Sequence, residues 1–386
     1  MSGKSPLAAP AAEPTEPPAD ARIEVDDEAL ESDSAYRDEL SSYSTSLASS
    51  VKDFQFKHGR RYHSYQAGSY QFPNDEPEQE RLDMFHHIVN LSLDGKLHLA
   101  PFNPEGARVL DIGTGTGIWA IDMGDLYPQA ELILGNDLSP IQPSWVPPNV
   151  KFVVDDAESN WVPTRPYDYI HARYLSASIS DWPRLVKQCY DHLTPGGWVE
   201  FHDVDGNPHS EDGSTEMTPK YKPQEMMDLL AVVCEKSNKV LQPGGSIKKW
   251  LEDAGFINVK YMMKKLPIGT WPKDKTLVRD DYLRMDGNMS HSFYDLYFSH
   301  LLPNSKELSL TILAGVQKEI GAFMALQCTE GVEAFTTYPF TQVLGWSKEE
   351  VEVFCAQLRA DVKRRDVHAL CPMHYVIGQK PEKTKA

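Results

Sequence analysis

The chain has 386 residues, of which 41% are hydrophobic and 24% are charged, and its formal net charge is −18. This balance excludes fibrous and wholly disordered proteins, and it disfavours binding to nucleic acid or to an anionic membrane surface because like charges repel. No apolar run reaches the roughly 20 residues that a membrane helix needs, and no signal-peptide pattern precedes the first acidic residues. We therefore expect a cytoplasmic protein, with the nucleus as the alternative, whose five widely spaced cysteines are free thiols.

Composition divides the chain into segments. Residues 1–50 hold 11 acidic and 3 basic side chains and few large apolar ones, which predicts a disordered acidic tail. A helix should begin at Asn74 or Asp75, because either side chain can cap it and apolar residues then recur at helical spacing. The predicted segments after the tail are N-terminal cap helices in 51–106, a ligand-binding core in 107–270, a helical cover insertion in 271–345, the last core helix and strand in 346–381, and a tail in 382–386.

Short apolar runs predict the core sheet. Five runs, at 108–112, 131–134, 151–154, 167–170 and 198–201, alternate with helical stretches, which is typical of a parallel sheet covered on both faces. Two later runs, at 257–263 and 374–377, add further strands. The prediction is an α/β, doubly wound fold with a helical cap.

A glycine-rich loop joins the first predicted strand to its helix. Gly113, Gly115 and Gly117 follow a G-x-G-x-G spacing, whereas a dinucleotide fingerprint has G-x-G-x-x-G. Asp111, two residues before the loop, would repel a pyrophosphate and attract an ammonium group. The combination indicates a nucleoside that carries an amino acid, as S-adenosylmethionine does, and disfavours a nicotinamide oxidoreductase. Thr114, within the loop, is assigned to the same site.

Acidic residues follow the next two strands, at the sheet edge where open α/β folds bind ligands. Asp137 can accept hydrogen bonds from a ribose diol, or can instead cap a helix ahead of Ser139. Leu138 is assigned to the same part of the site. Asp156 can accept from an adenine amino group, with the amide of Ala157 at the ring, or can belong to an acidic surface turn.

Candidate catalytic and lid residues lie near the same edge. His202 shares a strand face with Glu200 and can act as a base for a hydroxyl or amine, unless it is a structural histidine. Arg173 can hold a carboxylate or form a structural salt bridge. Tyr62 and Tyr70 can fold over the cofactor, or can simply pack. Strand alternation splits the ligand-type residues near position 200 between two faces, so we predict no metal site.

Several motifs together resemble a known family. The run Asp111-Ile-Gly-Thr-Gly-Thr-Gly117 and the segments 137–143, 155–158, 193–198 and 59–63 are similar to class I S-adenosylmethionine-dependent methyltransferases, and within them to the fungal LaeA-like methyltransferases. The resemblance covers about residues 56 to 381. It implies a seven-stranded sheet with an antiparallel last strand, and S-adenosylmethionine as cofactor.

The same resemblance implies two functions. The first is methyl transfer to an O, N or C atom of a small molecule, such as a fungal secondary metabolite. The second is a nuclear regulator of secondary metabolism that acts through protein partners. The apolar stripe Met285, Met289, Phe293 and Tyr297 can line a substrate pocket in the first case and can contact a partner or a second copy of the chain in the other. It can also simply pack in the core.

Overall fold

The computed structural model describes residues 54–66, 70–162, 165–272 and 306–383. The predicted acidic tail lies outside these ranges, and so does the apolar stripe between Met285 and Tyr297. Within the described ranges, no helix is both long and apolar enough to cross a membrane. Those ranges also contain no cluster of potential ligands that could hold a metal ion.

A seven-stranded sheet has the strand order β5-β4-β3-β6-β7-β9-β8. Neighbouring strands from β5 to β7 are parallel, and β9 runs antiparallel to both β7 and β8. This order confirms the predicted methyltransferase sheet with its antiparallel last strand. The strands are β3 (Arg108–Ile112), β4 (Leu132–Asp137), β5 (Val150–Val154), β6 (Tyr167–Arg173), β7 (Leu193–Val204), β8 (Ile257–Pro267) and β9 (Leu370–Gln379).

Helices cover both faces of the sheet because alternate strand residues are apolar on each side. Helices α4 (Trp182–His192) and α6 (Gly244–Ala254) pack on one face, in a cluster with Leu110 and Phe201. Helix α3 (Ile118–Leu126) packs on the other face, where Trp119 meets Val109 and Tyr169. On this second face, Asp111 and His171 stand between the apolar residues, at directly paired positions of β3 and β6.

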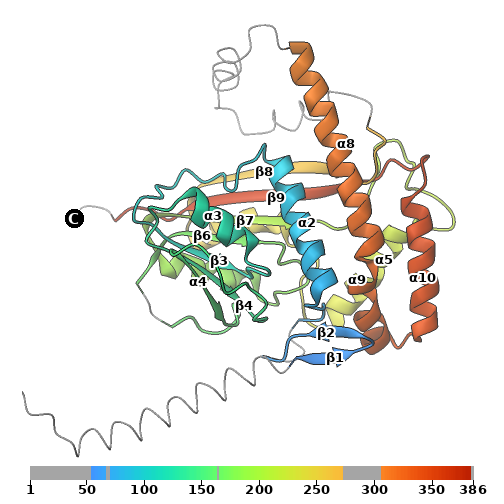
Figure 1. Cartoon of the computed structure of the whole chain (residues 1–386), viewed down its shortest axis with the longest axis horizontal. Helices are drawn as coiled ribbons and strands as arrows, with labels where there is room; N and C mark the ends of the chain where they lie inside the picture. Colours follow the sequence, from blue (N-terminus) through green and yellow to red (C-terminus); the bar gives the residue numbers. More distant parts are fainter. Residues whose placement is uncertain (1–53, 67–69, 163–164, 273–305, 384–386) are drawn as a thin grey trace, which may run out of the picture. The chain divides into compact units, whose positions relative to one another are not determined.

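The remaining helices form a cover with its own apolar core. Helix α2 lies beside α8 (Figure 1), and apolar residues of both belong to one buried cluster. Asp75 caps α2 by accepting a hydrogen bond from the Glu78 amide at 3.3 Å, as predicted. The cover helices are α2 (Glu76–Ser92), α5 (Lys222–Lys236), α8 (Lys306–Glu330), α9 (Val332–Pro339), η2 (Phe340–Leu344) and α10 (Lys348–Val362).

Part of the predicted N-terminal cap is a hairpin rather than a helix. Strands β1 (Gln55–Lys57) and β2 (Arg60–Tyr62) pair antiparallel across a two-residue turn. His58 and Gly59 in that turn have φ values of 52° and 79°. Positive φ at both central residues produces the tight turn that fits the twist of a hairpin, so the chain reverses here and does not enter a helix.

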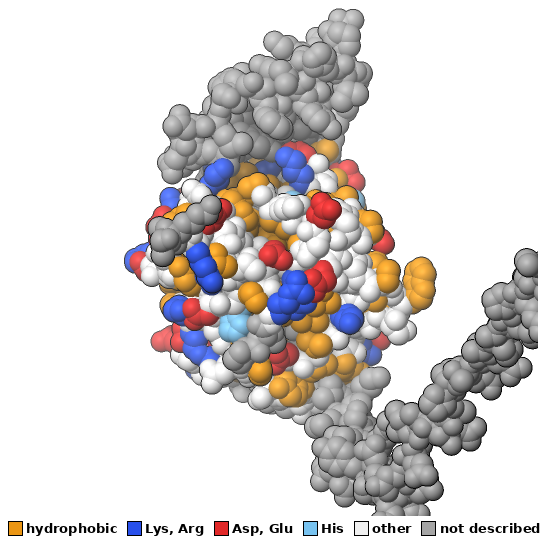
Figure 2. Space-filling view, turned by 90° about the vertical axis from the view of Figure 1, so that its left-hand side faces the viewer, with side chains coloured by type: hydrophobic (Ala, Val, Ile, Leu, Met, Phe, Trp, Pro, Cys, Tyr) orange, Lys and Arg blue, Asp and Glu red, His pale blue; other side chains and the backbone are white. Residues whose placement is uncertain are grey.

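Charged side chains are mixed on the surface. Figure 2 shows acidic and basic groups interspersed, with no gathering of one sign, over the face that it presents. The expectation that the protein does not bind nucleic acid stays a prediction.

Candidate active site

The glycine loop between β3 and α3 has a strained backbone that glycine accommodates. Gly113, Gly115 and Gly117 have φ values of 64°, 59° and 83°. A Cβ atom at Gly113 would lie 2.6 Å from the Leu175 side chain, and one at Gly117 would lie 2.4 Å from the ring of Phe152. A Cβ atom at Gly115 would meet its nearest neighbour at an ordinary 3.6 Å. A Cβ atom would therefore clash at the first and third glycines, whereas at the second it would make an ordinary van der Waals contact with Leu82.

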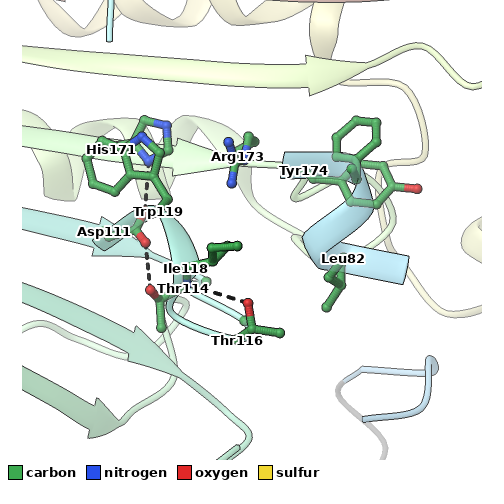
Figure 3. Close-up of a pocket in the computed structure, with 12 residues that line it drawn as sticks. Leu82, Asp111, Thr114, Thr116, Ile118, Trp119, His171, Arg173 and Tyr174 are labelled. Carbon is green, nitrogen blue, oxygen red and sulfur yellow. Dashed lines mark hydrogen bonds and ion pairs between the residues drawn. The ribbon is translucent and has the colours of Figure 1, made fainter. Parts of the chain in front are cut away.

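Gly115 lines a pocket between the loop, the end of β6 and the inner face of α2. Figure 3 shows the side chains that surround it. Its lining residues are Leu82, Phe85, Asp111, Gly113, Thr114, Gly115, Thr116, Ile118, Trp119, His171, Arg173 and Tyr174. The pocket thus contains one carboxylate and one guanidinium, and its α2 side is apolar.

Asp111 is a buried carboxylate, 3% exposed, at the inner end of the pocket. Its two oxygens accept hydrogen bonds from the Thr114 hydroxyl at 2.6 Å and from Nδ1 of His171 at 2.7 Å. Burial raises the pKa of Asp111 to about 7, although the Thr114 hydroxyl opposes the shift. The His171 ring stacks on Trp119 at 3.8 Å, and burial lowers its pKa well below the ordinary value. His171 is therefore neutral at pH 7 and donates from Nδ1 to Asp111.

Arg173 ends β6 and brings a cation to the same pocket. Its Nη2 atom lies 2.8 Å from Nδ1 of His86 in α2. In the described part of the chain, no carboxylate forms an ion pair with this guanidinium, and Asp111 acts on it only at longer range. Burial lowers the pKa of Arg173 to about 10, so it is charged at pH 7. The predicted alternative, a structural salt bridge, does not form among the described residues.

Asp137 connects the end of β4 to the glycine loop. One oxygen accepts a hydrogen bond from the Gly115 amide at 2.9 Å and the other from the Ser139 amide at 2.8 Å. Burial raises the pKa of Asp137 to about 6, against these two hydrogen bonds. No helix begins at Ser139, so the alternative of a helix cap is wrong. Neither Asp137 nor Leu138 lines the pocket, and their contacts with a ribose stay predictions.

Asp156 and Ala157 form a turn after β5. The Asp156 carboxylate accepts from the Glu158 amide at 2.9 Å and from the Ser159 hydroxyl at 3.3 Å. The Ala157 carbonyl accepts from the indole of Trp161 at 3.0 Å. The local geometry is that of an acidic turn, and the predicted adenine contact stays a prediction.

The two candidate lid tyrosines have different surroundings. Tyr62 is buried, and its ring lies 5.2 Å from that of Tyr338 in α9. Tyr70 contacts Phe72 edge-on at 5.2 Å. Burial raises the pKa of Tyr70, and its ring also lies 6.1 Å from that of His63. Tyr62 packs into the cover, and the lid role of both tyrosines stays a prediction.

His202, the predicted base, does not line the pocket. It is 1% exposed, and its Nε2 atom lies 2.5 Å from a Glu200 oxygen. Its ring contacts His171 at 5.1 Å and Tyr375 at 4.9 Å, both edge-on. Strand alternation does put His202 on the α3 face, but there its ring packs between the side chains of the neighbouring strands, His171 of β6 and Tyr375 of β9. The structure thus separates His202 from the pocket and gives no support for a direct catalytic contact.

Glu200 has a structural role. Its carboxylate accepts hydrogen bonds from the amides of Leu99 and Ala100 and from the hydroxyl of Tyr169, at 2.8–3.0 Å. Burial opposes ionisation, but His202 and these donors outweigh it and hold the pKa of Glu200 at about 2. Glu200 therefore fixes the segment between α2 and β3 to the sheet.

Sequence reasoning did not assign several of the residues around the pocket to the site. Phe85 and His86 point inward from α2, Trp119 lies under His171, and Tyr174 follows Arg173. Tyr174 has a φ of 59°, and its ring stacks on Phe85 at 4.4 Å. The apolar spacing along α2 predicted a buried face there, but which side chains meet β6 depends on how the helix docks.

Comparisons with known proteins agree with this geometry. A model of a methyltransferase domain matches residues 84–261. Methyltransferase pytC of Aspergillus terreus is 45% identical over 366 residues, which cover 95% of this chain and 98% of pytC. The secondary metabolism regulator LAE1 of Cochliobolus heterostrophus is 32% identical and covers 84% of this chain and 94% of its own length. The regulator laeA of Aspergillus fumigatus is 30% identical, over 84% of this chain and 76% of its own length.

The match to pytC extends over nearly the whole of both chains, so it includes the cover helices as well as the sheet. The glycine loop, Asp111 and Arg173 all lie within the segment that the domain model matches. The chain therefore belongs to the S-adenosylmethionine-dependent methyltransferases, in the family that includes these fungal proteins.

Proposed function

We propose that the pocket holds the methionyl end of S-adenosylmethionine and that the protein methylates a small molecule, as in the tailoring of a fungal secondary metabolite. The observation that carries this proposal is the pair of opposite charges in one pocket. Asp111 and Arg173 both line it without pairing with each other. An amino acid brings an ammonium and a carboxylate, which complement these two groups.

The residues present fit the cofactor. Asp111 already accepts two hydrogen bonds, and a carboxylate has room for further donors such as an ammonium. The backbone at Gly115 can approach a ligand because this residue lines the pocket and has no Cβ atom. Asp137 would hold the ribose, and Asp156 with Ala157 would meet the adenine ring at the next strand end.

The α2 side of the pocket would serve the reaction. When bound, S-adenosylmethionine supplies an electrophilic methyl group on a sulfonium. Leu82, Phe85 and Tyr174 form an apolar wall that would exclude water and pack against an apolar acceptor. Transfer of a methyl group mainly requires alignment of the acceptor with that group, so positioning accounts for most of the catalysis that these residues would provide.

Calorimetry with S-adenosylhomocysteine tests the cofactor site. We expect binding to the wild-type protein and a loss of at least about tenfold in affinity for Asp111→Ala, since a charge-assisted contact contributes about 1.5–3 kcal/mol. Circular dichroism would show that the variant is folded. Tight binding of NAD in place of S-adenosylhomocysteine would refute the proposal.

A second function has a specific basis, because LAE1 and laeA carry names of regulators and are similar over 84% of this chain. Incubation with labelled S-adenosylmethionine and a fungal metabolite extract separates the two functions. A labelled small-molecule product, identified by its mass, supports the enzyme. Cofactor binding without any such product would favour a regulator that acts through protein partners.

A further inference from the structure

A chain of three polar side chains leads from α3 through α2 to the pocket. Asp122 of α3 has a carboxylate oxygen 2.9 Å from Nε2 of His86. On the other side of the same ring, Nδ1 lies 2.8 Å from Nη2 of Arg173. His86 is buried, whereas the Asp122 side chain is 42% exposed. The imidazole thus joins a solvent-facing carboxylate to the guanidinium that lines the pocket.

The partners at the two ends fix the tautomer of His86. A guanidinium can only donate, so Nδ1 must accept, and an ionised carboxylate can only accept, so Nε2 must carry the hydrogen. Nδ2 of Asn90 also lies 2.8 Å from Nε2, and a half turn of this amide exchanges the nitrogen for Oδ1, which can share the Nε2 hydrogen with Asp122. Both ends therefore require the same neutral imidazole.

The charges around the ring favour that neutral form. Burial lowers the pKa of His86, and the positive charge of Arg173 lowers it further, although Asp122 and Asp83 act in the opposite direction. From the strands, the carboxylate of Asp111 and the hydroxyl of Tyr375 also face the guanidinium. At neutral pH the ring therefore keeps a lone pair on Nδ1 for Arg173.

An arginine side chain has several rotatable bonds, and fixing it in one conformation costs entropy that a ligand must otherwise supply. The hydrogen bond to His86 fixes one amino group of the guanidinium in advance, and its other donors have no hydrogen-bond partner among the described residues. No carboxylate of the described residues pairs with this side chain. Such a cation is prepared to receive an anion in the pocket.

We propose that His86 is a positioning residue, which together with Asp122 holds Arg173 ready to bind the carboxylate of the cofactor's amino-acid moiety. The inference rests on the proposed cofactor site and adds residues outside the glycine loop to it. It predicts that replacing His86 lowers the affinity for ligands that carry this carboxylate and leaves the affinity for ligands without it unchanged.

The test compares two ligands by calorimetry. The first is S-adenosylhomocysteine, and the second is its decarboxylated analogue, in which an aminopropyl group keeps the ammonium and removes the carboxylate. The wild-type protein should bind the first at least about tenfold more tightly. His86→Ala should remove most of this preference by weakening only the first ligand, and Arg173→Ala should do the same.

Two conservative variants separate positioning from packing. In His86→Asn the amide oxygen lies near the position of Nδ1 and can accept from Arg173, so the preference should largely return. In His86→Gln the amide lies near Nε2 and can still meet Asp122, but it leaves Arg173 without its acceptor, so the preference should stay low. His87→Ala is the matched control, because this neighbouring side chain is 49% exposed and faces Glu319.

The outcomes distinguish this inference from the proposed function. If the wild-type protein binds both ligands with equal affinity, the proposed role of Arg173 is wrong. If His86→Ala loses affinity for both ligands equally, His86 has a packing role and not a positioning role. If neither ligand binds the wild-type protein, the proposed cofactor site fails and the inference fails with it. Should His86→Ala not fold, Asp122→Ala at the exposed end must still reduce the preference selectively, and an unchanged ratio there would contradict the proposal.

Discussion

Replacing Gly117 by alanine adds one methyl group where neither the backbone nor the neighbouring ring can accommodate it. The residue has a φ of 83°, which costs an L-residue about 1–2 kcal/mol. Its Cβ atom would lie 2.4 Å from the ring of Phe152, and that ring is also confined by Gly135, where a Cβ atom would lie 2.7 Å away. Overpacking of this kind costs about 1–3 kcal/mol. Gly117→Ala should therefore lower the free energy of unfolding by about 2–5 kcal/mol.

Gly115→Ala is the matched comparison. It carries a similar backbone strain, but its Cβ atom would have no neighbour closer than 3.6 Å. The free energy of unfolding should therefore fall by only about 1–2 kcal/mol. The roughly 290 described residues imply an unfolding entropy of about 0.6 kcal/mol/K, which gives a fall in Tm of about 3–8 °C for Gly117→Ala and about 2–3 °C for Gly115→Ala.

Thermal unfolding followed by circular dichroism measures both shifts in Tm. Calorimetry with S-adenosylhomocysteine measures the effect of each substitution on ligand affinity. Gly115→Ala should lose at least about tenfold in affinity because its methyl group occupies the pocket. The reasoning fails if Gly117→Ala melts at the same temperature as Gly115→Ala. It also fails if Gly115→Ala binds the ligand as well as the wild-type protein does.

Three further predictions concern the carboxylates. Asp137→Ala should weaken binding of S-adenosylhomocysteine at least about tenfold, because it removes the charged acceptor that holds the Gly115 amide at 2.9 Å; an unchanged Kd in calorimetry would contradict this. The affinity of the wild-type protein for S-adenosylhomocysteine should rise from about pH 6 and level off above about pH 8, because the pKa of Asp111 is about 7 and only its ionised form attracts an ammonium. In Asp111→Asn the affinity should no longer rise with pH over this range. Glu200→Gln should lower the free energy of unfolding at pH 7 by about 3–5 kcal/mol in urea denaturation. The pKa of Glu200 is about 2, below its ordinary value, so its contribution is present above about pH 4.5 and is lost as the pH falls toward 2; a loss under about 1 kcal/mol would show that the carboxylate is dispensable.

Local sequence patterns were sufficient for most of the framework. Short apolar runs between helical stretches identified the strands, because a parallel sheet covered on both faces buries its strands on both sides. The capping candidates Asn74 and Asp75 identified the start of α2. The glycine spacing and Asp111 indicated the site because these residues follow one another in the chain. The turn at His58-Gly59 was not predicted, because the two strands beside it have only three residues each and show no strand pattern.

Only the tertiary structure decided which polar side chains reach the pocket. His171 and His202 both lie on the α3 face and near strand ends, and strand pairing sets His202 opposite Arg173 and Tyr375. The sequence contains no signal for that register, because it depends on which strands become neighbours. The same holds for His86, which meets Arg173 across 87 residues of sequence. Short-range patterns specify faces and termini, whereas contacts between distant segments are determined by how whole elements pack against one another.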